Sequence, residues 1–123
     1  KVKSNIDSGT FGAVQDAGIV ALSSPKEVVD EIRKVYQQRI EILYKALKDI
    51  DLVLEKPRAT LYLWAWVKGS SIDYAAKLLE RTGIVATPGL GFGKYGEGYM
   101  RFSITRETKR VEEAARRLEK MKD

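Results

Sequence analysis

Residues 99–105 of the chain read YMRFSIT, and the alternation of residue types along them predicts a β-strand. The two faces of that strand would carry different residues: Met100, Phe102 and Ile104 on one, and Tyr99, Arg101, Ser103 and Thr105 on the other. An arginine in the middle of a short strand is unusual, because burying an unpaired guanidinium costs several kcal/mol. The strand therefore raises the question of what Arg101 binds.

A glycine-rich stretch, PGLGFGKYGEG at residues 88–98, comes directly before this strand. Gly89, Gly91 and Gly93 give a G-x-G-x-G pattern, which occurs in nucleotide-binding motifs. Those motifs require a helix after the glycines, because the helix N-terminus binds the phosphate, whereas here the glycines lead into a strand. The pattern favours a flexible or tightly turned loop, with Lys94 solvated, and such a loop can still shape the entrance to a site.

The segments around this loop predict strands grouped with helices. Strand patterns cover residues 51–55, 60–67 and 84–87, and helical spacing covers residues 25–49, 72–81 and the segment after Thr105. Ser70 or Ser71 is the expected N-cap of the middle helix and Thr105 that of the last. This order predicts an α+β two-layer sandwich, in which a small mixed β-sheet packs on helices.

The N-terminal segment predicts a helix over residues 11–22, after a polar stretch in which Asp7 or Ser8 is the expected N-cap. Gln15 and Asp16 are its only polar residues, and a helix that is apolar nearly all round is buried on several sides. A chain of 123 residues has little material to cover such a helix at its own end. We therefore expect the helix to fold back or to pair with a second copy.

The composition limits the chemistry that the chain can perform. Its 123 residues are 44% hydrophobic and 32% charged, as in a globular domain, and they include neither cysteine nor histidine. Disulfides and histidine-based catalysis are therefore excluded, and no metal site is expected. No apolar run is long enough to span a bilayer, and no signal-peptide pattern opens the chain, so the expected compartment is the cytoplasm.

The net charge of +5 raises the possibility of nucleic-acid binding, but the charge pattern argues against it. Glu112 and Arg116, and likewise Glu113 and Arg117, are i,i+4 pairs of opposite sign on the last predicted helix. A solvated face of mixed sign follows a phosphate backbone poorly, so nucleic acid is not an expected partner.

Arg101 has two interpretations on the sequence pattern alone. It forms a structural ion pair with a carboxylate such as Glu97, or its planar guanidinium binds a small anion through two parallel hydrogen bonds. The nearby aromatic residues Tyr62, Trp64 and Trp66 share one strand face and are expected to serve packing rather than base stacking.

Several stretches of the sequence resemble a known family. PGLGFGKYGEGYMRFSIT, followed by a helix rich in Glu, Ala and Arg, is similar to the C-terminal end of class I/II aminotransferases. These are pyridoxal-phosphate enzymes of the aspartate-aminotransferase fold type. The opening KVKSNIDSGTFGAVQDAGIVAL resembles the segment after their cofactor lysine, and LEKPRATLYLWAWV resembles their small-domain strands. KSNIDSG and the glycine loop are most similar to LL-diaminopimelate aminotransferases.

The resemblance implies roles for four residues. Arg101 corresponds to the arginine that binds the α-carboxylate of the amino-acid substrate. Ser4 and Asn5 correspond to a pair near the dimer interface and active site, and Leu61 to a position that borders the substrate side chain. Ala59 stands where the family's hairpin has glycine.

The resemblance also implies that the chain is a fragment. Residues 1–23 would end a large domain and begin a linking helix, and residues 24–123 would form a small C-terminal α/β domain. The lysine that forms the Schiff base with pyridoxal phosphate would lie upstream, so the fragment is expected to hold no catalytic residue, to bind no cofactor and to be inactive alone. The parent would be a homodimeric, cytoplasmic aminotransferase acting on an amino acid and a 2-oxo acid. The alternative is an independent regulatory domain that binds amino acids or anions.

Overall fold

The computed structural model describes residues 1–6 and 9–122 of the chain. The chain forms two compact units, Lys1–Arg33 and Lys34–Asp123. The N-cap expected at Asp7 or Ser8 lies outside the described residues. The domain boundary expected after residue 23 stays a prediction.

The first unit consists of helices. It holds α1 Val2–Ile6, α2 Gly12–Leu22 and the first turns of α3, which runs from Lys26 to Lys48. The helix predicted over residues 11–22 is present, but none of the residues of α2 is buried. Its apolar side chains, such as Ile19 and Val20, are exposed, so the helix is uncovered within the described part of the chain.

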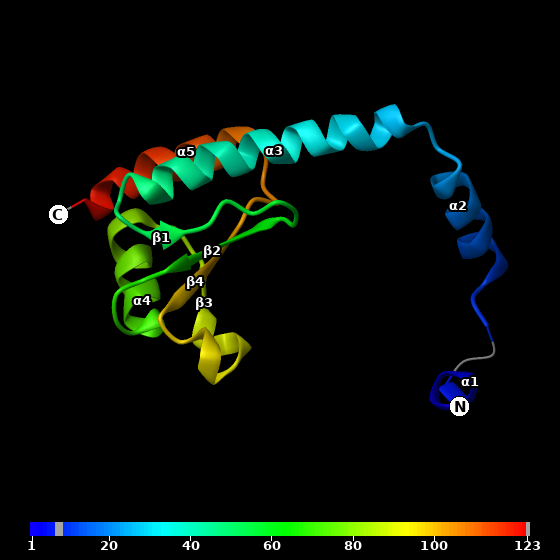
Figure 1. The fold of residues 1–123 in the computed structure, drawn as a ribbon, viewed down its shortest axis with the longest axis horizontal. Coiled ribbons are helices and arrows are strands. Elements are labelled where there is room, and N and C mark those ends of the chain that lie inside the picture. The colour runs from blue at the N-terminus through cyan, green and yellow to red at the C-terminus, as the bar shows by residue number, and fades with distance from the viewer. Residues whose placement is uncertain (7–8, 123) are drawn as a thin grey trace. The chain divides into compact units, whose positions relative to one another are not determined.

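The second unit is built on a four-stranded sheet with the strand order β1-β2-β4-β3 (Figure 1). The strands are β1 Val53–Leu54, β2 Tyr62–Trp66, β3 Thr87–Pro88 and β4 Tyr99–Ser103. The α+β class is confirmed, but every neighbouring pair is antiparallel, so the sheet is not mixed as expected. The direction of β3 could not be read from the sequence, because a strand of two residues carries too short a pattern.

One face of this sheet carries the hydrophobic core, as the alternation along β2 and β4 predicted. The buried residues from these strands and their ends are Leu63, Ala65, Val67, Met100, Phe102 and Ile104. The last turns of α3, together with α4 Ser71–Thr82 and α5 Thr108–Leu118, complete the core with Leu43, Leu47, Leu78, Val111 and Leu118. The helices thus form one layer and the sheet the other (Figure 1).

The ends of α4 follow local capping rules. The Ser70 hydroxyl accepts a hydrogen bond from the backbone N–H of Asp73 at 3.2 Å, which confirms Ser70 as the N-cap. Gly83 ends the helix with φ 68°, the left-handed conformation that glycine adopts without strain.

The start of α5 differs from the prediction, since its N-cap is Glu107 rather than Thr105. A contact across the helical layer accompanies this difference. Arg39 of α3 donates a hydrogen bond from Nε to the Thr108 hydroxyl at 3.1 Å and from Nη1 to the carbonyl of Ile104 at 3.4 Å. The side chain of Arg39 thus joins the first residue of α5 to the end of the arginine-bearing strand, a contact distant in sequence that periodicity does not reveal.

The loop between β1 and β2 holds a strained residue. Thr60 has φ 82°, a conformation that is unfavourable for a β-branched side chain. The family's hairpin glycine corresponds to Ala59 of this chain. The strained backbone lies at the next residue, Thr60.

We expect Thr60→Gly to stabilise the protein by about 1 kcal/mol, because the relief of backbone strain exceeds the added freedom of the unfolded chain. Thermal unfolding would show a higher Tm for this variant. Thr105→Gly is the matched control, since Thr105 has an ordinary negative φ and its replacement should lower the Tm. A lower Tm for both variants would contradict the assignment of strain to Thr60.

Candidate functional site

Arg101 lies at the centre of β4, between two other strands. It pairs with Trp64 of β2 on one side and with Thr87 of β3 on the other. Its neighbours along the strand, Met100 and Phe102, point into the core, so Arg101 points to the opposite face of the sheet. The sequence predicted this placement.

The guanidinium of Arg101 contacts aromatic rings. Its Cζ lies 4.3 Å from the ring centroid of Tyr62 and 4.5 Å from that of Phe92, both within the range of a cation–π interaction. Its Nε is buried and has no hydrogen-bond partner. Because a buried donor without a partner is costly, the ring contacts offset only part of the cost of placing this guanidinium on the strand.

Glu97 does not pair with Arg101, although an ion pair between them was one interpretation of the sequence. Its carboxylate instead accepts two hydrogen bonds from Ser71, from the backbone N–H and from the hydroxyl, each at 2.9 Å. Ser71 is the first residue of α4, so the carboxylate lies at the positive end of that helix. The Ser71 N–H, and after it the Ser71 hydroxyl, lower the pKa of Glu97 below its ordinary value, because both bind the ionised form.

The glycine-rich loop is tightly closed on itself and does not have the form of a phosphate-binding loop. It contains two short 3₁₀ turns, η1 Gly89–Phe92 and η2 Lys94–Gly96, and then enters β4. A Cβ on Gly89 would lie 2.0 Å from the carbonyl oxygen of Gly96, and a Cβ on Gly96 would lie equally close to the carbonyl oxygen of Gly89. The loop thus closes through backbone contact that only glycine permits at both positions.

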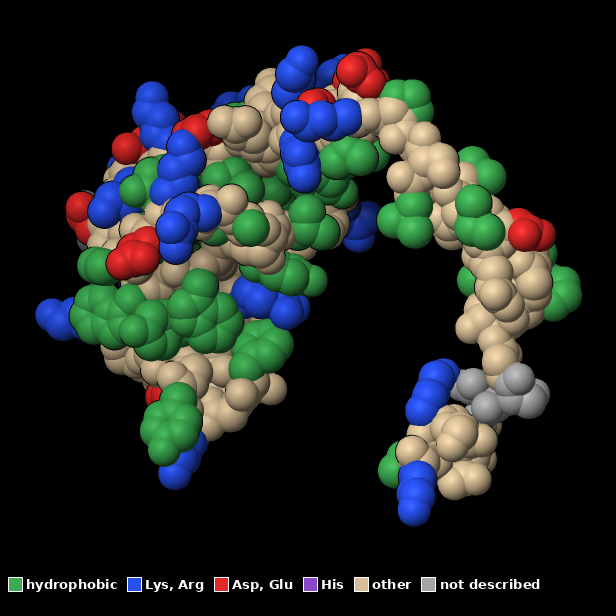
Figure 2. All heavy atoms as spheres, turned by 45° about the vertical axis from the view of Figure 1, so that its right-hand side comes forward, with side chains coloured by type: hydrophobic (Ala, Val, Ile, Leu, Met, Phe, Trp, Pro, Cys, Tyr) green, Lys and Arg blue, Asp and Glu red, His purple; other side chains and the backbone are tan. Residues whose placement is uncertain are grey.

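Aromatic residues surround Arg101 on the open face of the sheet. Trp64 stacks on Tyr99 with ring centroids 5.6 Å apart, and it meets Phe92 edge to face at 5.7 Å. Tyr62, Trp64 and Trp66 remain 38% to 43% exposed. The space-filling view shows hydrophobic side chains on the surface of this unit, with basic side chains between them (Figure 2). Of the three residues of the predicted stripe, Trp64 packs on aromatic rings and Tyr62 contacts the guanidinium of Arg101.

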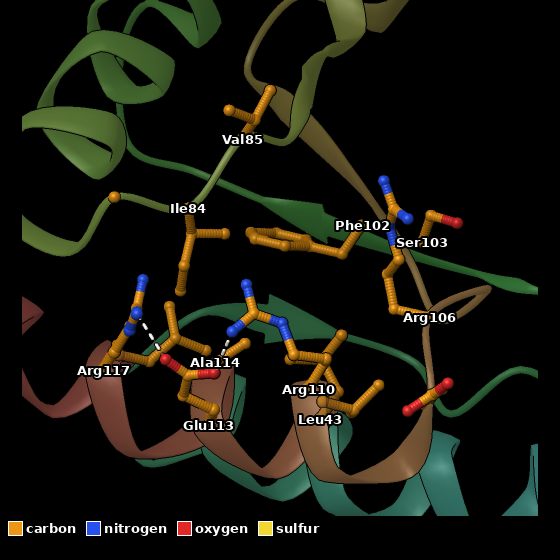
Figure 3. Close-up of a pocket in the computed structure, with 14 residues that line it drawn as sticks. Leu43, Ile84, Val85, Phe102, Ser103, Arg106, Arg110, Glu113, Ala114 and Arg117 are labelled. Carbon is orange, nitrogen blue, oxygen red and sulfur yellow. Dashed lines mark hydrogen bonds and ion pairs between the residues drawn. The ribbon is translucent and has the colours of Figure 1, made fainter.

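A separate hollow of about 610 Å³ lies between the sheet and α5. Its apolar wall includes Ile84 and Phe102, while Arg110 and Arg117 extend from α5 and both bind Glu113 (Figure 3). Arg101 does not line this hollow, and the charges of Arg110 and Arg117 are balanced in part by their shared carboxylate. The hollow is therefore distinct from the site at Arg101.

The other residues with expected roles lie elsewhere. Leu61 is half-buried and packs against the hydrophobic core, and its carbonyl accepts the N–H of Ile104 at 3.1 Å. Ser4 and Asn5 lie in α1 of the first unit, and each donates a side-chain hydrogen bond to the carbonyl of Lys1. The second unit thus holds Arg101 and Leu61, and the roles of Leu61, Ser4 and Asn5 stay predictions.

Comparison with known proteins identifies the family. The profile of "Aminotransferase class I and II" matches residues 1–118. The chain belongs to this family. Over 99% of its length it is 51% identical to the LL-diaminopimelate aminotransferase of Aquifex aeolicus, of which it covers 32%. The corresponding enzyme of Moorella thermoacetica is 47% identical over 98% of the chain.

Solved structures agree with this assignment. The probable N-succinyldiaminopimelate aminotransferase of Thermus thermophilus superposes with a TM-score of 0.86 at 37% identity, and the match covers 98% of this chain and 33% of that one. The L,L-diaminopimelate aminotransferase of Chlamydomonas reinhardtii gives the same TM-score at 28% identity, with 98% and 30% covered. The chain thus spans about a third of the length of the aminotransferases it matches.

The residues around Arg101 do not by themselves fit pyridoxal phosphate, the cofactor that the resemblance implies. The glycine loop leads into a strand rather than a helix N-terminus, and its lysine, Lys94, lies exposed with Nζ 4.9 Å from the Tyr95 ring centroid. Nowhere in residues 1–6 and 9–122 do three or more His, Cys, Asp or Glu gather as metal ligands. In the same ranges, every helix is too short or too polar to cross a bilayer.

Two features of the surroundings of Arg101 could not be predicted from the sequence. Phe92 looked like one more residue of a flexible loop, and its ring contact with Arg101 depends on how the loop folds. The bonds from Ser71 to Glu97 join residues 26 positions apart. Glu97 stands between two glycines, which marks it as an isolated carboxylate in the loop. The spacing of the sequence does not indicate that it binds Ser71, the first residue of α4.

We expect Gly89→Ala and Gly96→Ala each to destabilise the protein by at least about 2 kcal/mol, because the new Cβ would clash with backbone atoms that cannot move aside. Gly91→Ala is the control, since a Cβ there meets nothing within 4 Å. Denaturant unfolding measures all three variants. Equal stabilities for the Gly91 and Gly96 variants would show that the backbone contact is not required.

A pH dependence follows from Glu97. Because its pKa is lower in the folded protein, its stabilising effect is present above the ordinary pKa of 4.5 and is lost as the pH falls through the lower, folded pKa. Glu97→Gln should therefore be less stable than the parent near pH 7, and this difference should shrink at acidic pH. Denaturant unfolding at a series of pH values measures it, with Glu55→Gln as an exposed control. A difference that persists unchanged at about pH 3, below the ordinary pKa of a carboxyl group, would refute this account.

Proposed function

We propose that the chain is part of a pyridoxal-phosphate-dependent LL-diaminopimelate aminotransferase, in which Arg101 binds the α-carboxylate of the amino-acid substrate. The observation that carries this proposal is the state of the guanidinium. It lies on the open face of the sheet between aromatic side chains, with a buried Nε that has no partner and with no bound carboxylate among the described residues. The chain shares 51% and 47% sequence identity with two relatives named LL-diaminopimelate aminotransferase, which supports LL-diaminopimelate as the proposed substrate.

The physical argument rests on the cost of an unsatisfied charge. A partly buried guanidinium without an anion is less stable than one that is paired, so a carboxylate entering the site gains the interaction that the protein leaves open. Arginine offers parallel donors in one plane, which match the two oxygens of a carboxylate. Fixing that end of the substrate orients its α-carbon for reaction.

The chemistry itself would need residues outside this chain. Pyridoxal phosphate, when bound, supplies the electron sink for amino-group transfer, and its site would come from the remainder of the parent protein. The 123-residue chain would therefore be inactive alone. We further propose that the parent is a cytoplasmic homodimer that uses a 2-oxo acid as amino acceptor, with Ser4 and Asn5 near its interface and Leu61 beside the substrate.

We expect Arg101→Lys in the full-length protein to raise the KM for LL-diaminopimelate by about 10- to 100-fold. An ammonium retains the charge but cannot reproduce two parallel hydrogen bonds. Steady-state transamination with a 2-oxo acid such as 2-oxoglutarate measures this change.

Arg106→Lys provides the control. Arg106 lines the separate hollow next to α5, so its replacement should leave the KM unchanged. An unchanged KM in the Arg101 variant would refute the carboxylate-binding role. Saturable binding of glutamate or aspartate to the 123-residue chain without pyridoxal phosphate would favour an independent amino-acid-binding domain instead.

A further inference from the structure

We propose that Tyr62 and Phe92 are positioning residues, which hold the Arg101 guanidinium in the plane and direction in which it receives a substrate carboxylate. This inference rests on the carboxylate-binding role proposed for Arg101. It adds two residues whose side chains act on the substrate only through that arginine.

The two rings approach the guanidinium from different elements. Tyr62 is the first residue of β2 and pairs with Ser103, so it is the diagonal neighbour of Arg101 across the sheet. Phe92 is the last residue of the turn η1 in the glycine loop. Both centroids lie within 4.5 Å of the Arg101 Cζ, yet the two rings are not themselves in contact within the described structure. The two ring contacts of Arg101 thus come from a strand and from the glycine loop, which lie far apart in the sequence.

A guanidinium binds aromatic rings and anions in different directions. The hydrogens of a guanidinium point outward in its own plane, whereas aromatic rings bind its faces. A ring in contact with the guanidinium excludes water where the two touch and limits rotation of the group about its long side chain. The in-plane edge then remains for an acceptor, which suits the planar carboxylate of an amino acid.

The ring of Phe92 is half-exposed, and on the protein side it contacts a second aromatic residue besides the guanidinium. Its ring meets Trp64 edge to face at 5.7 Å, and Trp64 stacks on Tyr99. The backbone of the loop is closed by the contact between Gly89 and Gly96. The loop thus brings one ring to the arginine, and its glycines serve that closure rather than phosphate binding.

The test uses the full-length holoenzyme and compares Phe92→Leu and Tyr62→Leu with the ring-preserving variants Phe92→Tyr and Tyr62→Phe. We expect the leucine variants to raise the KM for LL-diaminopimelate roughly 3- to 30-fold. The kcat should change less than about twofold, since the lost interaction is present in ground state and transition state alike. The ring-preserving variants should stay within about twofold of the parent in both constants. Tyr95→Leu is the loop control, because Tyr95 is 87% exposed and contacts Lys94 rather than Arg101.

A second measurement separates positioning from folding. The Ki of a carboxylic acid that resembles the substrate but lacks its α-amino group should rise in parallel with KM, and neither constant depends on the fraction of enzyme that is folded. Unchanged KM and Ki in both leucine variants, beside a raised KM in Arg101→Lys, would overturn the positioning role and leave the proposed function intact. Unchanged constants in Arg101→Lys as well would overturn both. A lower kcat with unchanged KM and Ki would indicate a purely structural role and would also overturn this inference.

Discussion

The contact between the Arg101 guanidinium and the rings of Tyr62 and Phe92 is the interaction on which the rest of the site depends. A positive charge on a strand, with a buried Nε that has no partner, would destabilise the sheet if nothing offset it. The rings supply part of that offset, about 0.5 to 2 kcal/mol for each contact, and they do so without occupying the in-plane donors. The guanidinium can still gain an interaction with an anion, and we propose that this anion is a substrate carboxylate.

The sheet and the glycine loop are both arranged around this contact. Met100 and Phe102 anchor β4 in the core. The backbone from which the Arg101 side chain extends on the other face is therefore held in place. The loop is closed at one point by Gly89 and Gly96, and its end is tied to α4 by the bonds between Glu97 and Ser71. The carboxylate that could have neutralised Arg101 is thereby used at a helix N-terminus instead.

The sequence revealed the periodic features of this fold and missed those that depend on side chains meeting across it. The strand around Arg101, the core face of β2 and the Ser70 cap were all predicted, because each follows from residues close in the chain. The direction of β3 and the start of α5 were not, since a two-residue strand has no readable pattern and Arg39 reaches the α5 terminus from another helix. For the site, the arginine was evident, whereas its aromatic neighbours and the partner of Glu97 emerged only from the folded loop.

The most direct test of the central claim is a crystal structure of the full-length protein with a bound amino-acid substrate or a carboxylate analogue. The account predicts that both oxygens of the α-carboxylate lie about 2.7–2.9 Å from nitrogens of Arg101, in the plane of the guanidinium and between the rings of Tyr62 and Phe92. A substrate carboxylate bound elsewhere, or an Arg101 already paired with a carboxylate from another part of the protein, would contradict it.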